Sequence, residues 1–190
     1  MITIVSSLIA TGCQPAMSTP IHHNPPENRD VSRPFTFDRH NFGAYCYDTY
    51  GCKVLYNDRY VTSQDDNELR PSSASVGPDY LKNLDGGYLG IANFPPPAVV
   101  TWRSKDGTPH EAHIDIGEIF KDRIIRHNVP REELPTETTA TAAPDIVLEV
   151  NDRTINVYMK AFVSTRSLQV PGNQYSDFRN DMILAFSQTY

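Results

Sequence analysis

The chain has 190 residues, of which 39% are hydrophobic, and its 17 Lys and Arg against 23 Asp and Glu give a formal net charge of −6. This length has room for one domain, or one domain with a tail, and allows a sizeable buried core. The acidic balance argues against nucleic acid as the main partner, because phosphate binding needs concentrated Lys and Arg, and no run reaches the roughly 18 apolar residues that span a membrane.

Residues 1–13 form a short apolar run that ends in small residues and Cys13. The pattern is typical of a bacterial lipoprotein signal, in which the cysteine thiol takes a diacylglyceryl group, although no Lys or Arg precedes Cys13 as a secretory signal usually requires. A buried amino-terminal strand with a chance cysteine is the alternative. We expect lipidation at Cys13 and a periplasmic location, and Gln14 after the cysteine favours anchoring to the inner leaflet of the outer membrane.

Residues 14–34 are rich in Pro, Ser, Asn and His and almost free of large apolar residues. This composition predicts a flexible tether. About twenty such residues could hold a folded domain some 25 Å from a membrane, on the random-coil estimate. We therefore expect a β-rich binding domain over residues 35–190.

From Phe35 onward, apolar and polar residues alternate with the period of half-buried strands. Hairpins are predicted over residues 42–61, 99–116 and 146–163, and residues 182–186 read as a closing strand. A helical stripe is confined to residues 116–127 and ends before Pro130. The patterns predict a mostly β fold, an antiparallel β-sandwich-like single domain with about seven strands and one short helix.

Cys46 and Cys52 flank the turn-forming residues Asp48 and Gly51. A hairpin would bring the two sulfurs opposite each other, and the chain-entropy model gives such a disulfide about 2 to 3 kcal/mol. Three cysteines then divide into one for lipid and two for a disulfide, which suits an oxidising compartment. A cysteine-only metal site is disfavoured because the chain has no second pair.

The sequence holds no GxSxG elbow, phosphate-binding glycine loop or HExxH motif. His110 and His113 come nearest to a metal pair, but on a strand they point to opposite faces. Trp102 shares a face with Val100 and is expected in the core. We expect no enzyme activity, no metal and no cofactor.

Residues 62–87 form a long segment with five acids against two bases. Long loops inside domains are often functional, although an ordinary solvated excursion is the main alternative. The segment combines charge for steering a partner with tyrosines for apolar contact, and the tip of the hairpin around residues 105–108 is the second candidate. The candidate contact residues are Asp65, Asp66, Glu68, Tyr80, Tyr88 and Asp106.

The carboxy-terminal half also carries a resemblance to a known family. The stretches are VTWRSKDGTPHEAH (100–113), IDIGEIF (114–120), RHNVP (126–130), VNDRTINVYM (150–159) and YSDFRNDM (175–182). Together they resemble the immunity lipoproteins encoded beside phospholipase effectors of the bacterial type VI secretion system. The resemblance implies a periplasmic, lipid-anchored protein that binds and blocks a toxic lipase.

Two other classes of function stay open. One is a structural or interaction lipoprotein of the envelope without a toxin partner, and the other is a small hydrolase with an unrecognised site. A lipase gene beside this one would favour immunity over the first. A deep pocket with convergent polar groups would favour the second.

Overall fold

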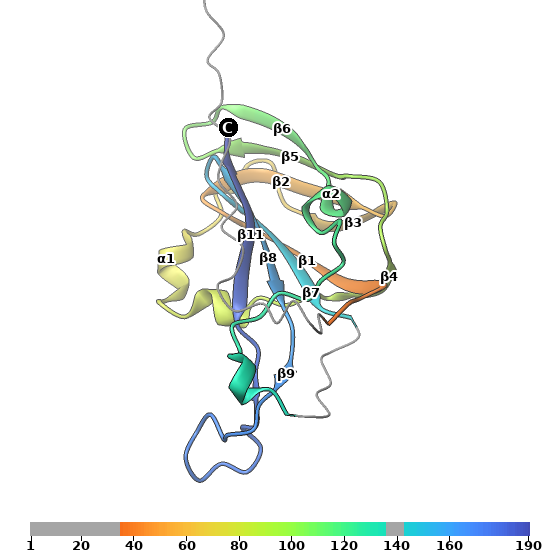
Figure 1. Cartoon of the computed structure of the whole chain (residues 1–190). Coiled ribbons are helices and arrows are strands. Elements are labelled where there is room, and N and C mark those ends of the chain that lie inside the picture. Colours follow the sequence, from red (N-terminus) through yellow and green to blue (C-terminus); the bar gives the residue numbers. More distant parts are fainter. Residues whose placement is uncertain (1–34, 136–142) are drawn as a thin grey trace, which may run out of the picture.

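The computed structural model describes residues 35–135 and 143–190, and its fold is mostly β, as the alternating pattern predicts (Figure 1). One sheet has five strands in the order β11 (Met182–Thr189), β8 (Thr154–Lys160), β7 (Asp145–Asn151), β1 (Arg39–Tyr47) and β4 (Tyr88–Ala92). The other has four strands in the order β3 (Arg59–Ser63), β2 (Thr49–Tyr56), β5 (Ala98–Ser104) and β6 (Pro109–Ile114). A short ribbon pairs β9 (Val163–Ser164) with β10 (Phe178–Arg179).

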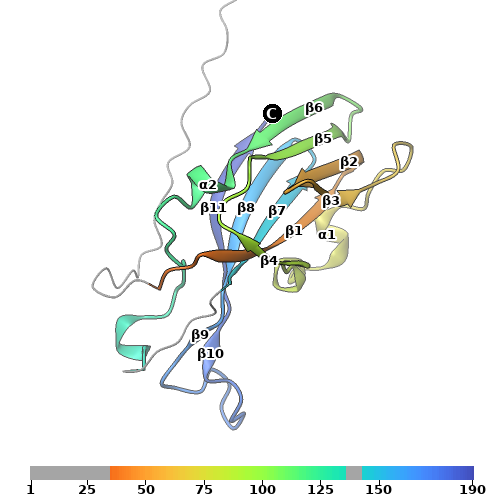
Figure 2. The same cartoon turned by 90° about the vertical axis from the view of Figure 1, so that its right-hand side faces the viewer.

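Four short helical turns connect the strands: α1 (Ser73–Val76), η1 (Tyr80–Asn83), α2 (Ile116–Ile119) and η2 (Arg131–Glu133). The two large sheets pack as layers around a shared core (Figure 2). Every second side chain of a strand points to the same face, so alternate apolar residues of the strands form this core. Within the described residues, all named ladders are antiparallel except that of β1 with β7.

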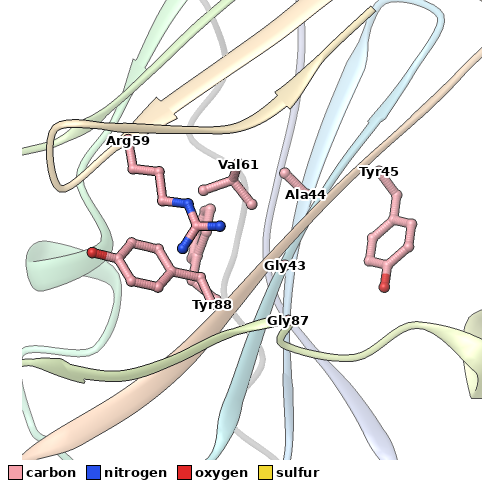
Figure 3. A pocket seen from close by; sticks show the side chains of 8 residues that line it. Gly43, Ala44, Tyr45, Arg59, Val61, Gly87 and Tyr88 are labelled. Carbon is pink, nitrogen blue, oxygen red and sulfur yellow. The ribbon is translucent and has the colours of Figure 1, made fainter.

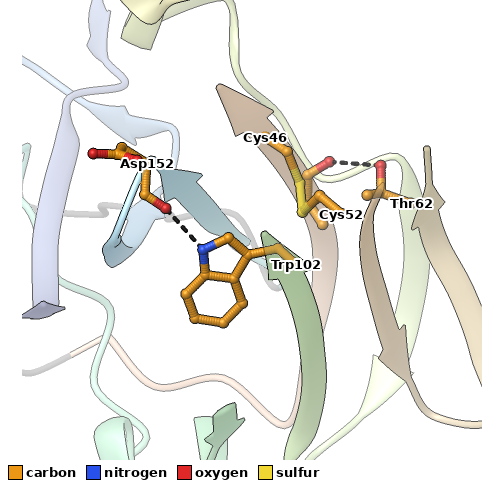
Figure 4. Close-up of a disulfide and its surroundings, with 6 residues drawn as sticks. Cys46, Cys52, Thr62, Trp102 and Asp152 are labelled. Carbon is orange, nitrogen blue, oxygen red and sulfur yellow. Dashed lines mark hydrogen bonds between the residues drawn. A yellow bond between two sulfur atoms is a disulfide. The ribbon is translucent and has the colours of Figure 1, made fainter. Parts of the chain in front are cut away.

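Two of the three predicted hairpins are confirmed. They are β7 with β8 and β5 with β6. Trp102 of β5 lies in the core at 3% exposure, and its indole nitrogen donates to the carbonyl of Asp152 at 2.7 Å (Figure 4). This bond ties the turn between β7 and β8 to the opposite sheet. The predicted closing strand is also present as β11.

The predicted hairpin over residues 42–61 is wrong, because β1 and β2 belong to different sheets. Asp48, at a φ of 51°, turns the chain from one sheet into the other. The local hairpin is instead formed by β2 and β3 around Asn57 and Asp58, whose positive φ angles of 50° and 58° suit a tight turn. β1 pairs in parallel with β7, far along the chain, and no local pattern reveals such a partner.

The predicted disulfide between Cys46 and Cys52 is present, although its setting differs from the prediction. It joins the end of β1 to β2, and therefore links the two sheets rather than the two strands of one hairpin (Figure 4). Both residues are buried, with Cys52 at 0% exposure.

The predicted helix over residues 116–127 is shorter than expected. α2 has only four residues and begins where the Asp115 side chain accepts from the backbone N–H of Glu118 at 2.9 Å. Beyond Phe120 the rest of the predicted helix is not helical and pairs with the segment that precedes β1. There the N–H of Ile125 donates to the carbonyl of Phe35 at 2.8 Å. Of the apolar stripe, Ile116 and Phe120 are buried, whereas Ile119 and Ile124 are only partly buried.

His40 of β1 is fully buried beside Asn93 and Tyr56. The amide nitrogen of Asn93 donates to the Phe37 carbonyl, so its oxygen accepts from His40 Nδ1 at 2.7 Å. Nε2 is then left to accept from the Tyr56 hydroxyl at 3.0 Å. Burial lowers the pKa of His40, which favours the neutral ring in this network.

The predicted lipidation at Cys13 and the predicted tether over residues 14–34 lie outside the described residues. No helix in residues 35–135 and 143–190 is long and apolar enough to cross a membrane.

Candidate partner-binding surface

The acidic segment is held against the sandwich and does not project from it. We call residues 64–87 the covering segment. Near its start, the N–H of Gly51 donates to the Asp65 carbonyl at 3.0 Å, and near its end the Lys160 ammonium donates to the carbonyls of Lys82 and Leu84 at 3.0 and 2.9 Å. The segment thus begins at β2 of the four-stranded sheet, and its later part, around η1, packs on the outer face of the five-stranded sheet.

A buried carboxylate fastens the covering segment to that face. Glu149 of β7 has 0% exposure, and its Oε1 accepts from the Tyr80 hydroxyl of η1 at 2.9 Å. Its Oε2 accepts from the Tyr158 hydroxyl at 3.0 Å and from the Asn156 amide at 2.9 Å. A weaker bond of 3.3 Å comes from the amide of Asn151. The segment and two strands therefore share one hydrogen-bonded centre.

Burial, together with the nearby Glu149 carboxylate, raises the pKa of Tyr80 to about 12. The same two causes raise the pKa of Tyr158. Both hydroxyls consequently stay protonated and act as donors to the carboxylate. The sequence pattern does not indicate a role for Glu149, because a polar residue that alternates with valine and leucine is expected to face solvent.

Three of the four predicted acidic contact residues, Asp65, Asp66 and Glu68, lie in one exposed stretch of the covering segment. Asp65 accepts from the N–H of Asn67 at 2.7 Å, whereas Asp66 pairs with Lys53 at 3.2 Å. Glu68 is exposed. Tyr80 is separated from this stretch, since its hydroxyl is turned to Glu149.

Tyr88, at the start of β4, lines a cavity of about 310 Å³ between β1 and β3 (Figure 3). Its hydroxyl accepts from the amide of Asn57 at 2.8 Å. The guanidinium carbon of Arg59 lies 4.9 Å from the centroid of the Tyr88 ring, within the range of a cation–π contact. Buried Phe42 lines the same cavity.

Asp106 belongs to a polar cluster in the turn between β5 and β6. The Ser104 hydroxyl donates to Asp106 at 2.6 Å, and His110 Nε2 lies 3.1 Å from the same hydroxyl oxygen. The Ser104 hydroxyl, a backbone bond from Thr108 and the Arg153 guanidinium together hold the pKa of Asp106 well below its usual range.

This cluster places a serine beside a histidine, but not in the geometry of an activated nucleophile. Ser104 is fully buried, and its proton is directed to Asp106 rather than to His110. A catalytic serine needs access to substrate and a base that takes its proton. The His110 ring instead stacks on Trp102 at 4.9 Å, so the cluster suits a structural role in the turn.

His113 lies on the opposite face of β6 from His110, as expected, and its Nε2 is 3.3 Å from Glu111. Within residues 35–135 and 143–190, no group of three or more His, Cys, Asp or Glu is arranged to hold a metal ion. A second cavity of about 480 Å³ opens between the edge strands β6 and β11, with Ile119, Phe186 and Tyr190 in its lining.

Exposed apolar side chains gather on a different element. We call residues 162–179 the lobe; it comprises β9, β10 and their connection. In both views the lobe extends away from the two sheets, at the end opposite the carboxyl terminus (Figures 1 and 2). Nine large apolar side chains are exposed in the described part of the chain, and the lobe carries four of them: Phe162, Leu168, Val170 and Tyr175.

Internal hydrogen bonds define the path of the lobe. The N–H of Thr165 donates to the Asp177 carbonyl at 2.8 Å, and the N–H of Gln169 donates to the Ser176 carbonyl at 2.7 Å. Closer to the tip, the Ser176 hydroxyl oxygen accepts from the N–H of Val170 at 3.0 Å. The lobe is therefore a hydrogen-bonded hairpin extension.

The base of the lobe is braced by η2. The Arg166 backbone N–H and its guanidinium Nε donate to the carbonyls of Glu133 and Leu134, both at 2.8 Å. Ser167 adds two bonds of 3.2 Å to the Glu133 carboxylate. Val163 is buried at the root of the lobe. The apolar side chains near the tip are thus presented from a supported base.

The lobe was not among the surfaces predicted from the sequence. Its only signal was a set of apolar residues set among turn formers such as Pro171 and Gly172, and the predicted contacts were placed elsewhere. Comparisons of the chain with protein-family models, with curated proteins and with solved structures found no match.

Proposed function

We propose that this protein is a periplasmic immunity protein that binds and inhibits a toxic phospholipase effector of a type VI secretion system. The observation that carries the proposal is the concentration of exposed apolar side chains on one supported lobe. Single exposed apolar residues are common, but clusters of them mark interaction sites. Tyrosine at such a site is a frequent anchor in protein interfaces.

The class of partner comes from the sequence resemblance described above. One of its stretches, residues 175–182, begins in the lobe and runs into β11, so the resemblance includes part of the proposed surface. The buried disulfide suits an oxidising compartment such as the periplasm. A lipid on Cys13 would hold the domain at the outer membrane, where an incoming phospholipase would act.

Co-purification with the phospholipase encoded beside this gene tests the proposal. The Cys13→Ser chain, produced without lipid, should form a stable complex with that phospholipase and abolish its hydrolysis of phospholipid micelles at equimolar concentration. An unrelated phospholipase serves as control and should keep its activity. In cells that express the effector in the periplasm, growth should depend on this protein.

Full phospholipase activity in the presence of excess protein would contradict the proposal. Binding without inhibition would also contradict it, and would favour an interaction lipoprotein of the envelope that has no protective role.

A further inference from the structure

The charges of the lobe region are balanced, and three of the four have partners within the protein. Between Phe162 and Asp181 the chain carries two arginines and two aspartates, a net charge of zero in a chain of −6. The Arg166 guanidinium donates to the Leu134 carbonyl, and Arg179 pairs with Asp181 at 2.8 Å. The lobe therefore offers a partner little net charge, and its large exposed side chains Phe162, Leu168, Val170 and Tyr175 are apolar or aromatic.

The three apolar side chains near the tip are the most suitable contacts. Leu168, Val170 and Tyr175 are 46%, 54% and 76% exposed. They extend from a ribbon whose paired strands have only two residues each, so the element is narrow and convex. A narrow convex element buries more of its surface in a cleft than on a flat face.

We propose that the lobe inserts into an apolar cleft of its protein partner and blocks that cleft. The inference rests on the proposed function, in which the partner is a phospholipase and the cleft is the one that receives the acyl chains of the lipid. Inhibition is then steric, and lobe and lipid exclude each other. No chemical step by this protein is required.

The support of the lobe favours such insertion energetically. Ordering a flexible loop at an interface costs free energy for every side chain and backbone unit that becomes fixed. Here the bonds from Thr165 to Asp177 and from Gln169 to Ser176, together with the brace from Glu133, exist before binding. The apolar contacts of the lobe therefore contribute more fully to affinity.

The composition of the tip distinguishes a protein cleft from a lipid bilayer. Its outermost residues are Gly172, Asn173 and Gln174, all exposed, and the larger apolar side chains lie on either side of them. If the lobe inserted into a bilayer, these polar groups would enter the hydrocarbon layer first. Their hydrogen bonds to water would be lost there without replacement. A protein cleft can provide polar groups at its end and apolar walls around them.

A pair of matched triple variants tests the lobe. The test variant is Leu168→Ser, Val170→Ser, Tyr175→Ser. The control is Leu89→Ser, Val76→Ser, Tyr60→Ser, which replaces the same residue types at exposures of 69%, 52% and 61% outside the lobe. The single variant Tyr175→Ala, at the most exposed of the three positions, provides a third chain with the least disturbance of folding.

Binding kinetics with the purified phospholipase give the main measurement. We expect the lobe variant to raise Kd at least about 100-fold, chiefly through faster dissociation, because interface anchors typically contribute a factor of about 30 or more each. The control should stay within about threefold of the native chain. A non-hydrolysable phospholipid analogue should compete with the native chain for the enzyme.

The outcomes separate this inference from the proposed function. If the native chain does not bind the phospholipase, both are overturned. If the native chain binds and inhibits while the two triple variants behave alike, only the role of the lobe is overturned. The role of the lobe is also overturned if the lipid analogue and the native chain bind the enzyme together. It is overturned as well if the native chain binds lipid vesicles or dimerises and the lobe variant no longer does so.

Discussion

Replacement of Glu149 by glutamine should loosen the covering segment and lower the free energy of unfolding. A glutamine side chain has the same shape but replaces one acceptor oxygen by an NH₂ donor. If the new NH₂ takes the place of Oε2, it faces the Asn156 amide and the Tyr158 hydroxyl, which both donate to that oxygen in the native protein. At least one bond is then lost, and the others lose their charge.

The magnitude follows from the bonds involved. A hydrogen bond to a charged group contributes about 1.5 to 3 kcal/mol, against about 0.5 to 1.5 kcal/mol for a neutral pair. Glu149→Gln loses one such bond and weakens the remaining ones. This loss of stability is partly offset because the neutral glutamine avoids the desolvation cost of a buried charge. We expect Glu149→Gln to cost about 2 to 3 kcal/mol. Glu149→Ala should cost about 4 kcal/mol, since several buried donors then have no acceptor and each unsatisfied buried group costs about 1 to 3 kcal/mol.

Urea unfolding measures the global effect and amide hydrogen exchange measures the local one. Exchange should accelerate most at residues 73–84, which the Tyr80 bond fastens to the sheet. Tyr80→Phe should produce the same local effect at a global cost of about 1 kcal/mol. Exposed Glu111→Gln is the control and should change stability by less than about 0.5 kcal/mol.

Two results would refute this reasoning. One is a Glu149→Gln protein within about 0.5 kcal/mol of the native one, which would show that the carboxylate contributes no more than an ordinary surface residue. The other is a destabilised protein whose covering segment exchanges no faster, which would show that Glu149 supports the sheet alone.

Three further predictions concern the disulfide, the buried histidine and the anchor. The double variant Cys46→Ala, Cys52→Ala should unfold at lower urea concentration, with a loss of about 2 kcal/mol from the short closed loop, and a reductant should have little further effect on it. Because the folded-state pKa of His40 is lowered, the free energy of unfolding should fall as pH drops from the ordinary value of 6.5 to the lowered pKa. His40→Gln should reduce this pH dependence by up to about 1.4 kcal/mol per pH unit. If urea unfolding shows the same loss of stability between pH 7 and pH 5 in the native chain and the variant, the assignment is contradicted. Mass spectrometry of protein from the native host should find an acylated Cys13, and Cys13→Ser should move the folded domain into the soluble fraction, whereas an unmodified Cys13 that keeps its upstream residues would contradict the anchor.

Local patterns were sufficient for the parts of the fold that are close in sequence. The alternation around residues 146–160 and the turn signals near Gly107 predict hairpins because both strands and the turn lie in one short window. The position of Trp102 in the core follows from the same alternation. In contrast, the partner of β1 is β7, with Asn41 paired to Asp145, and such a distant ladder leaves no local trace.

The same limit applies to the candidate site. The turn at Asp48 resembles a hairpin turn in sequence, although it joins two sheets. Glu149 is covered only because a segment about seventy residues away folds over it, which alternation cannot indicate. Leu168 and Val170 are exposed because nothing in the described residues covers them, and exposure of an apolar residue is a property of the tertiary structure.

The parallel ladder between β1 and β7 has a consequence for the order of folding. A chain emerges amino end first, and β1 precedes its ladder partner by more than 100 residues, as the pairing of Asn41 with Asp145 shows. The five-stranded sheet therefore cannot close until most of the chain is present, which places late, long-range pairing in the slow part of folding. Cys46 and Cys52 are only six residues apart and can join much earlier. A disulfide formed early would fix the connection between β1 and β2 before β7 is available to pair with β1.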